Sequence, residues 1–156
     1  MSPSGRWWVN VADFVFQGTS VLSLDGKGRI TVPARHRDAL AALSNSQLTI
    51  TRHPDGYLLV FARPNWEAFR SKLMTLPMSA DGWRRLFLGS AVDVEVDSAA
   101  RVLVPPELRA AAGLAKDVRL IGMGNRLELW DAARHAAHEA EVLAGPMPEA
   151  IQGFNF

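Results

Sequence analysis

The chain has 156 residues, of which 48% are hydrophobic and 21% charged, as expected for one folded domain or two very small ones. It contains no cysteine, which excludes disulfides, thiolate catalysis and Cys-based zinc sites. The formal net charge of +1 is a weak signature for a nucleic-acid binder, although only three of the 17 basic residues are lysine. Arginine suits bidentate contacts to phosphate or guanine, but a GC-rich genome accounts for the arginine excess equally well.

Residues 1–16 give no sign of a secretory signal, because Arg6 is their only basic residue and they contain no continuous apolar core. The longest apolar run in the chain, Tyr57–Ala62, is too short to cross a bilayer. We therefore expect a soluble protein with no membrane partner.

An internal repeat dominates the sequence. The segment Asp25-Gly26-Lys27-Gly28-Arg29-Ile30-Thr31-Val32-Pro33 returns 72 residues later as Asp97-Ser98-Ala99-Ala100-Arg101-Val102-Leu103-Val104-Pro105. The match includes Leu22 and Leu24 against Val94 and Val96, and Arg37 against Arg109. The shared pattern is Φ-x-Φ-D-x-x-x-R-Φ-x-V-P-x-x-x-R, where Φ is apolar. Such self-similarity is typical of a duplicated structural unit.

Within the first copy, apolar residues at 22, 24, 30 and 32 alternate with polar ones, which predicts a β-hairpin with one buried face. Gly26 and Gly28 permit positive φ in its tight connection. The second copy has neither glycine, which leaves its turn geometry open.

A second hairpin is predicted in each copy. In the first, residues 48–52 and 57–61 flank Pro54-Asp55-Gly56, and in the second, residues 118–121 and 127–130 flank Gly122–Asn125. Both connections carry residues that favour turns.

Helices are expected at five places. Pro106 at a first helical position and Gly113 after the last one predict a helix over Pro106–Ala112 and, by symmetry, over Ala34–Leu43. Asn65 is the expected N-cap of a helix ended by Pro77, with Trp66, Phe69, Leu73 and Leu76 on one face. Further helices are predicted over Trp83–Leu88, opened by Asp81, and from Asp131 to about Leu143, before Gly145-Pro146 and a loose tail.

These elements predict a mainly β protein with appended helices, of the α+β class. Two units of about 50 residues bury little core alone, so we expect them to pack on each other as one pseudo-symmetric domain. The expected segments are an N-terminal extension (1–14), a first repeat (15–64), a helical connector (65–88), a second repeat (89–131), and a C-terminal helix and tail (132–156).

The two D-x-x-x-R-Φ-x-V-P segments, the Leu86–Gly89 step and the Leu127–Trp130 strand together resemble the MraZ family, from Phe16 to about His138. The resemblance implies two AbrB-like swapped-hairpin repeats forming one double-split β-barrel, with a helix added to each repeat. It also implies a cytoplasmic, nucleoid-associated bacterial regulator, with a repressor as the expected form. Such a regulator binds short G-rich direct repeats of double-stranded DNA, upstream of the division and cell-wall gene cluster, as a homo-oligomeric ring. Because family members begin near Phe16, residues 1–14 are interpreted as an extension and Val15 as an alternative start.

The two repeats differ in charge. Residues 22–40 carry a net +2 and the matching residues 94–112 a net −1, so we expect repeat one to make the dominant phosphate contact. A narrow Gly-Lys-Gly-Arg turn can enter the major groove. The predicted DNA-binding residues are Lys27, Arg29, Arg35 and Arg37, with Arg29 at guanine or an adjacent phosphate, Lys27 at phosphate or base, and the other two at the backbone.

Asp25 is expected to orient Arg29 and to cap the turn amides, with Gly26 and Gly28 shaping the turn. Asp97, Arg101 and Arg109 are expected to be structural or a secondary DNA contact. An alternative stays open at both copies, and is favoured at the second: the Asp–Arg pairs only fix the hairpins.

No catalytic, metal, cofactor or small-molecule site is predicted. His135 and His138 have helical spacing but no third ligand, which favours a solvated helix face, and His36 and His53 are expected at the surface or in turns. Trp66, Trp83 and Trp130 are expected to pack helices or subunits. Two rival interpretations remain: an AbrB-type or antitoxin-type regulator, which usually has one hairpin unit, and a structural ring that binds DNA without sequence preference.

Overall fold

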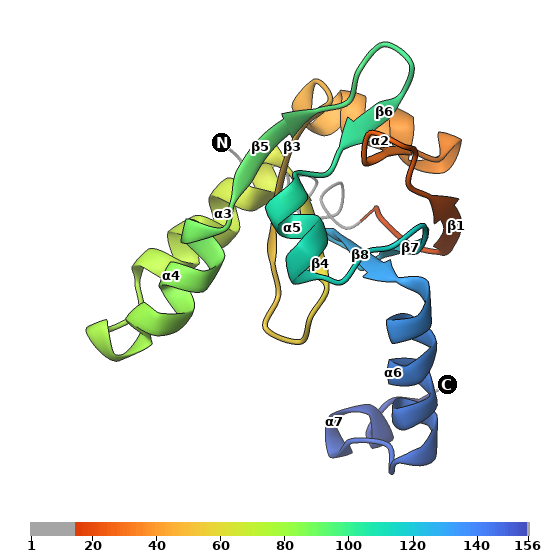
Figure 1. The fold of residues 1–156 in the computed structure, drawn as a ribbon. Helices are drawn as coiled ribbons and strands as arrows, with labels where there is room; N and C mark the ends of the chain where they lie inside the picture. Colours follow the sequence, from red (N-terminus) through yellow and green to blue (C-terminus); the bar gives the residue numbers. More distant parts are fainter. Residues whose placement is uncertain (1–14, 156) are drawn as a thin grey trace.

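The computed structural model describes residues 15–155, so the predictions for residues 1–14 lie outside it (Figure 1). The first repeat and the connector comprise β1 (Thr19–Ser23), β2 (Arg29–Thr31), α2 (Ala34–Ser44), β3 (Gln47–Arg52), β4 (Leu58–Ala62), α3 (Arg63–Met74), the 3-10 turn η1 (Met78–Ala80) and α4 (Asp81–Gly89). The second repeat and the C-terminal part comprise β5 (Val92–Glu95), β6 (Arg101–Leu103), α5 (Pro106–Ala111), β7 (Asp117–Gly122), β8 (Leu127–Asp131), α6 (Ala132–Ala144) and α7 (Glu149–Gln152).

The strands flanking each D-x-x-x-R turn do not pair with each other, which corrects the local hairpins predicted above. Instead β1 pairs with β7, β5 pairs with β3, and β2 pairs with β6, so each of these strands finds its partner in the other repeat. The alternation of apolar residues fixes which face of a strand is buried but does not choose its neighbour. The exchange gives a six-stranded antiparallel sheet, β1-β7-β8-β4-β3-β5, and a separate β2–β6 ribbon.

The strand order is palindromic between the repeats, and the register reveals an internal twofold axis. In the ribbon Ile30 pairs with its own counterpart Val102. In the sheet Leu59 pairs with Glu128, which occupies the matching place because α3 and α6 begin directly after equivalent strands. The axis therefore passes through both pairs.

The second hairpin of each repeat is confirmed as β3–β4 and β7–β8. The β4–β8 pairing joins the two hairpins, and the fully buried Leu58 and Leu129 face each other there. One apolar cluster contains residues from β2, β3, β4, β6, β7 and β8 together with Leu40 of α2 and Leu108 of α5. The chain is thus a mixed α+β structure in which both repeats share a core; closure into a double-split barrel stays a prediction.

The helices largely follow the predicted positions. Gly113 follows α5 with a φ of +60°, as expected of a residue just after a helix. The N-cap of α3 is Ala62, however, so Asn65 lies inside the helix and is buried rather than capping it. His36 was expected at the surface but is buried in α2, where its ring meets Phe16 edge-on at 5.7 Å. The segment predicted as a loose tail contains α7.

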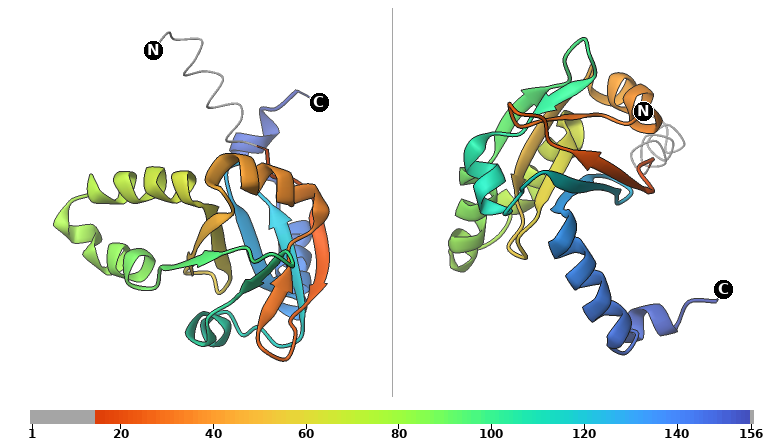
Figure 2. Two further views of the ribbon diagram at one scale, coloured as in Figure 1. Left: turned by 90° about the horizontal axis from the view of Figure 1, so that it is seen from above. Right: turned by 45° about the vertical axis from the view of Figure 1, so that its right-hand side comes forward.

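Helices α3 and α4 form a hairpin on one side of the sheet, over a second apolar cluster built on Tyr57, Leu59, Phe61, Trp66 and Trp130. Helix α6 leaves the sheet in a different direction and is followed, after a short connection, by α7 (Figure 2). Across residues 15–155, the structure contains no helix with the length and apolar character needed to span a membrane.

Candidate nucleic-acid interface

The first D-x-x-x-R turn is closed by its aspartate. One carboxylate oxygen of Asp25 accepts hydrogen bonds from the backbone N–H groups of Lys27 and Arg29, both at 2.9 Å. The other oxygen accepts from Nε of Arg29 at 2.7 Å. Asp25 therefore caps the turn and holds Arg29, a geometry that fits both the expected orienting role and the alternative in which the pair only fixes the hairpin.

The second turn repeats these contacts without the glycines. Asp97 accepts from the backbone of Ala99 at 2.9 Å, from the backbone of Arg101 at 2.8 Å and from Nε of Arg101 at 3.3 Å. Ala100 takes the left-handed conformation with a φ of +62°, where its counterpart Gly28 has +83°. Gly26 does not have positive φ, so only one of the two glycines in the first turn is required by the backbone.

These hydrogen bonds act on the acidity of the two carboxyl groups. The backbone N–H of Arg29 is the main cause that lowers the pKa of Asp25 to about 2, helped by the Arg29 side chain and the Lys27 amide. The backbone N–H of Arg101 likewise lowers the pKa of Asp97. Both carboxylates thus stay charged at neutral pH and hold their arginines.

We expect the Asp25 carboxyl group to titrate with a midpoint at about 2 in the folded protein. Because its pKa is lowered relative to the unfolded chain, its contribution to stability is full above the unfolded value of about 3.9 and disappears as the pH falls through about 2. Carboxyl carbon shifts measured by NMR would follow it, with the amide shifts of Lys27 and Arg29 changing together. In Arg29→Ala the pKa should move only part of the way to its ordinary value, since the amide remains. A midpoint near 4 in the wild type would contradict the capped turn.

The ribbon between the turns presents one face to solvent. Ile30 and Val102 point into the core, so the residues on either side of them, Arg29 and Thr31 on β2 and Arg101 and Leu103 on β6, lie on the outward face. Arg29 pairs with Leu103 and Thr31 with Arg101, which puts the two arginines at diagonal corners. Both repeats therefore contribute one motif arginine to a single surface.

Two further motif arginines, Arg37 and Arg109, each lie beside the motif turn of the other repeat. Arg37 and Arg109 occupy equivalent positions, and each donates its Nε to the carbonyl at the end of its own motif strand, Val32 at 2.8 Å and Val104 at 2.9 Å. A Cβ atom placed on Gly28 would lie 2.5 Å from Cζ of Arg109, so the Arg109 guanidinium rests against the first turn. Arg37 correspondingly lines a shallow hollow with Asp97 of the second turn.

The four predicted DNA-binding residues are therefore not all together. Lys27 and Arg29 belong to the first turn, Arg37 lies beside the second turn, and the Arg35 guanidinium contacts Gly18 at the far end of β1. The comparison of charge over residues 22–40 and 94–112 counted Arg109 with the second repeat, yet its guanidinium lies at the first turn. With the Arg109 guanidinium, the first turn gathers one more positive charge than its own segment contains.

The structure also shows the surroundings of the His135–His138 pair and of Gly122. The rings of His135 and His138 lie 5.6 and 5.0 Å from that of Trp130, and residues 15–155 contain no group of three potential metal ligands. The glycine at 122 is needed for packing, because a side chain there would collide with the backbone of Phe16 and Gln17.

Comparison with known proteins gives consistent matches along the chain. The family model described as "MraZ protein, putative antitoxin-like" matches twice, over residues 15–86 and 87–150. A protein named Transcriptional regulator MraZ from Leptothrix cholodnii is 65% identical over 146 residues, which cover 94% of this chain and all of the relative. Proteins of the same name from Methylibium petroleiphilum and an Acidovorax species are 60% and 58% identical, over 94% and 91% of this chain and all of each relative.

Proposed function

The chain belongs to the MraZ family, and we propose that it is a transcriptional regulator that binds double-stranded DNA through the β2–β6 ribbon and its two D-x-x-x-R turns. The finer proposal follows the family resemblance: a homo-oligomeric ring, located with the nucleoid, that represses the division and cell-wall gene cluster by binding G-rich direct repeats. No catalytic role or cofactor is part of it.

The observation that carries the proposal is the pair of fixed arginines on one exposed ribbon. A two-stranded ribbon fits the major groove of B-DNA. Asp25 uses only the Nε of Arg29, so the two terminal nitrogens remain to donate to guanine O6 and N7 or to a phosphate. A side chain already held in place loses little further freedom on binding, which favours affinity.

The first turn is proposed as the main contact. It brings together Lys27, Arg29 and the guanidinium of Arg109, opposed locally by Asp25 and by Asp117 beside Ser23. The second turn has Arg101 and Arg37, with Glu95, Asp97 and Asp38 nearby. Since phosphate binding follows local positive charge, the first turn should bind DNA more strongly than the second.

Weak contacts from single chains add up in a ring. Direct repeats spaced by about one helical turn, roughly 10 base pairs, would present the same groove to successive subunits. Linked contacts gain through effective concentration, so affinity should rise steeply with the number of repeats and fall steeply with salt. Equal binding to single-repeat and multi-repeat DNA would contradict this part of the proposal.

The direct test is fluorescence anisotropy with a duplex from upstream of the chain's own gene cluster and a scrambled duplex, at one salt concentration. Arg29→Ala should lose about 1–3 kcal/mol per site, which is roughly 5-fold to 150-fold in affinity for the specific duplex. Arg70→Ala, an exposed arginine on α3 away from the ribbon, is the control and should bind like wild type. If the wild type binds both duplexes equally, the ring without sequence preference is the better interpretation.

The same assay tells whether an arginine contributes to DNA binding because it lies near the first turn in space or because it lies near it in the sequence. We expect Arg109→Ala to weaken specific binding, because it removes a charge next to the first turn. Arg35→Ala should have a smaller effect, because its guanidinium lies at the other end of β1. Oligomer size and circular dichroism should be unchanged in both variants. The reverse order of effects would show that the contact runs along α2 instead of the ribbon.

A further inference from the structure

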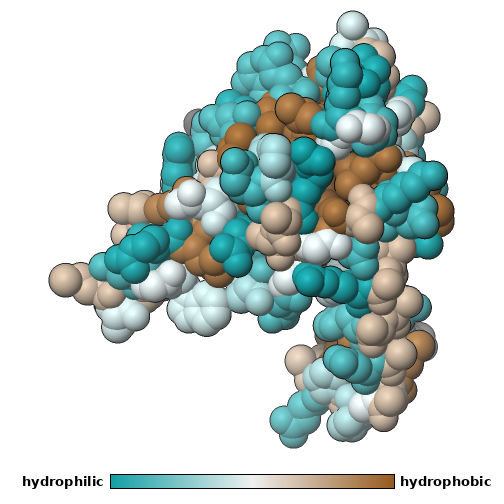
Figure 3. Space-filling model, in the orientation of Figure 1, coloured by the Kyte–Doolittle hydropathy of each residue, from teal (hydrophilic) through white to brown (hydrophobic). Residues whose placement is uncertain are grey.

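The last part of the described chain forms an arm with an exposed apolar face. Helix α6 is anchored at its start, where Asp131 accepts a hydrogen bond from the Arg134 amide at 3.1 Å, and then runs away from the sheet. Beyond that anchor Val142 and Leu143 are 61% and 78% exposed, and Met147 is 52% exposed. In Figure 3 the arm shows tan and brown atoms along its length at the lower right. Apolar residues gathered in this way on an extended element indicate a contact surface.

The internal symmetry shows which face of the arm lacks a cover. Helices α3 and α6 follow equivalent strands, so Leu73 corresponds to Val142 and Phe69 to His138. On α3 this face is packed: Leu73 is 6% exposed, and the ring of Phe69 meets that of Phe87 on α4 at 5.3 Å. Within residues 15–155, α6 has no helix corresponding to α4 against it. The face that one helix buries inside the chain is therefore left open on its counterpart.

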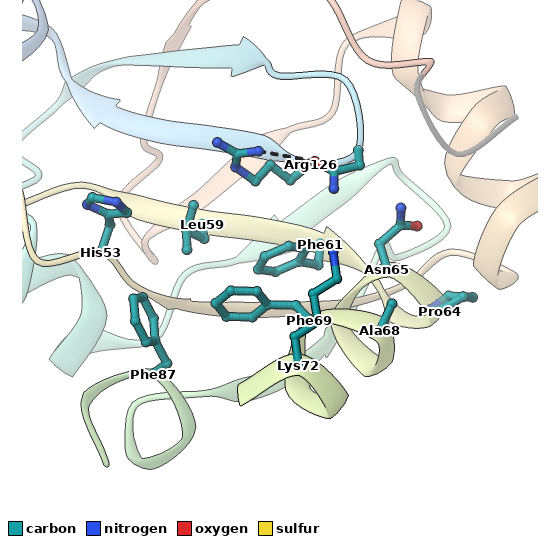
Figure 4. Close-up of a pocket in the computed structure, with 11 residues that line it drawn as sticks. His53, Leu59, Phe61, Pro64, Asn65, Ala68, Phe69, Lys72, Phe87 and Arg126 are labelled. Atoms are coloured by element: carbon teal, nitrogen blue, oxygen red, sulfur yellow. Dashed lines mark hydrogen bonds between the residues drawn. The ribbon is translucent and has the colours of Figure 1, made fainter. Parts of the chain in front are cut away.

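A groove of matching character lies beside α3. It encloses about 470 Å³ between β4, α3, α4 and the β7–β8 connection, and Figure 4 shows the rings of Phe61, Phe69 and Phe87 along it. Lys72 and Arg126 line its walls, and Arg126 is already paired with Glu128 at 3.8 Å, which leaves Lys72 as the cation that a partner could neutralise. Asn65 also lines the groove and is only 9% exposed, and its Oδ1 has no hydrogen-bond partner among the described residues. A buried carbonyl oxygen only accepts, so it favours a site that is filled by a group bringing a hydrogen-bond donor.

The charges of the two surfaces are complementary. After Arg134 the arm contains Glu139, Glu141 and Glu149 and no lysine or arginine. Glu139 precedes Val142 by three residues, which puts it on the same face of α6. In the groove, the Lys72 side chain forms no ion pair with any residue between 15 and 155. An acidic, apolar helix face thus has as its counterpart an aromatic groove in which Lys72 has no ion pair among the described residues.

We propose that the α6–α7 arm of one chain docks in the aromatic groove of a neighbouring chain, with Val142 near the phenylalanine rings and Glu139 near Lys72. This rests on the homo-oligomer that forms part of the proposed function. A chain does not use its own arm, because α6 and the α3–α4 hairpin point in different directions in Figures 1 and 2. Contact between two different surfaces is head-to-tail, the arrangement that closes into a ring when the rotation between subunits permits.

The first test compares Val142→Glu with Ala137→Glu by mass photometry and sedimentation. At about 100° per residue, Ala137 lies more than 100° around α6 from Val142 and from Leu143, so it is on the other side of the helix and is a matched control. Val142→Glu should raise the dissociation constant of the oligomer at least tenfold, and Ala137→Glu should assemble like wild type. Both substitutions are at exposed helix positions, so circular dichroism should show folded chains. A Val142→Glu variant that assembles like wild type, or a wild type that is monomeric, would overturn the proposal.

A charge exchange then tests the partner surface. Lys72→Glu and Glu139→Lys should each weaken assembly, and the double variant should recover most of it, because the pair is restored with reversed sign. Failure of the double variant to recover would show that the groove does not receive the arm. Specific DNA binding is measured in parallel: Val142→Glu should keep its weak binding to a single repeat and lose the gain on multiple repeats. A wild type that binds the specific and the scrambled duplex equally would count against the regulator proposal alone, because oligomer formation is measured in a separate experiment.

Discussion

Leu129→Ala should lower the free energy of unfolding of the whole chain by about 3 kcal/mol, within the roughly 2–5 kcal/mol found for truncating a buried leucine. Leu129 is fully buried and faces Leu58 across β8 and β4, where the two repeats join. The alanine would leave a cavity between strands that are fixed on both sides by their ladders, so collapse should be limited. Chemical denaturation followed by circular dichroism gives the change directly, with Leu103→Ala as the control. Leu103 is 48% exposed on the ribbon, and its truncation should cost about 0.5 kcal/mol or less.

The same variant tests whether the repeats fold as one unit. Because β1, β2 and β5 all pair with strands of the other repeat, neither repeat can complete its sheet alone. A cavity in β8 should therefore speed hydrogen exchange in β3 of the first repeat as much as in β7 of the second. We expect one unfolding transition in wild type and variant. Two separated transitions, with β3 still protected in the variant, would mean that the repeats are independent domains.

The duplicated motif was visible in the sequence because its chemistry is local. Asp25 contacts only residues two and four positions away, so the D-x-x-x-R spacing itself encodes the capped turn. The second hairpins were predicted for the same reason, since their turn residues lie between the two strands that pair. Helix ends marked by proline or glycine, such as Pro106 and Gly113, were close to their observed places.

The exchange of strands between repeats could not be derived from periodicity. Apolar and polar residues alternate around Leu22 and Ile30 as they would in the two strands of a hairpin. Those two strands nevertheless pair with β7 and β6. Only the family resemblance implied a swapped arrangement. The position of Arg109 against the first turn depends on that exchange, so a comparison of charge by sequence window assigned it to the wrong neighbour.

Two further features depend on context that a pattern does not carry. Ala100 adopts positive φ because the hydrogen bonds of the ribbon hold the turn, with Val32 donating to the Ala100 carbonyl at 2.7 Å. The groove beside α3 was not predicted, since Phe61, Phe69 and Phe87 come from three elements that meet only in the folded chain. Trp66 and Trp130 are buried as expected of packing residues, whereas Trp83 is 57% exposed.

Gly28→Val should be the most damaging substitution in the first turn and lower the free energy of unfolding by about 3 kcal/mol. Gly28 has a φ of +83°, where a β-branched residue is strained by roughly 1–3 kcal/mol. Its new side chain would also occupy the place of the Arg109 guanidinium, because even a Cβ would lie 2.5–2.7 Å from three of its atoms. Overpacking of this kind costs a further 1–3 kcal/mol, roughly, although a flexible arginine can move aside and reduce that cost.

The second repeat supplies the matched control at the equivalent position. Ala100→Gly relieves the strain of a φ of +62° but makes the unfolded chain more flexible, two effects of about 1 kcal/mol that oppose each other. Its stability should therefore stay within about 0.5 kcal/mol of wild type. Thermal and chemical unfolding of both variants measure the contrast. In DNA binding, Gly28→Val should also weaken the specific complex by displacing Arg109, an effect that Arg109→Ala would reproduce without the loss of stability caused by backbone strain. If Gly28→Val and Ala100→Gly were equally stable, the left-handed turn and the arginine packed on it would not be the constraint that makes glycine necessary there.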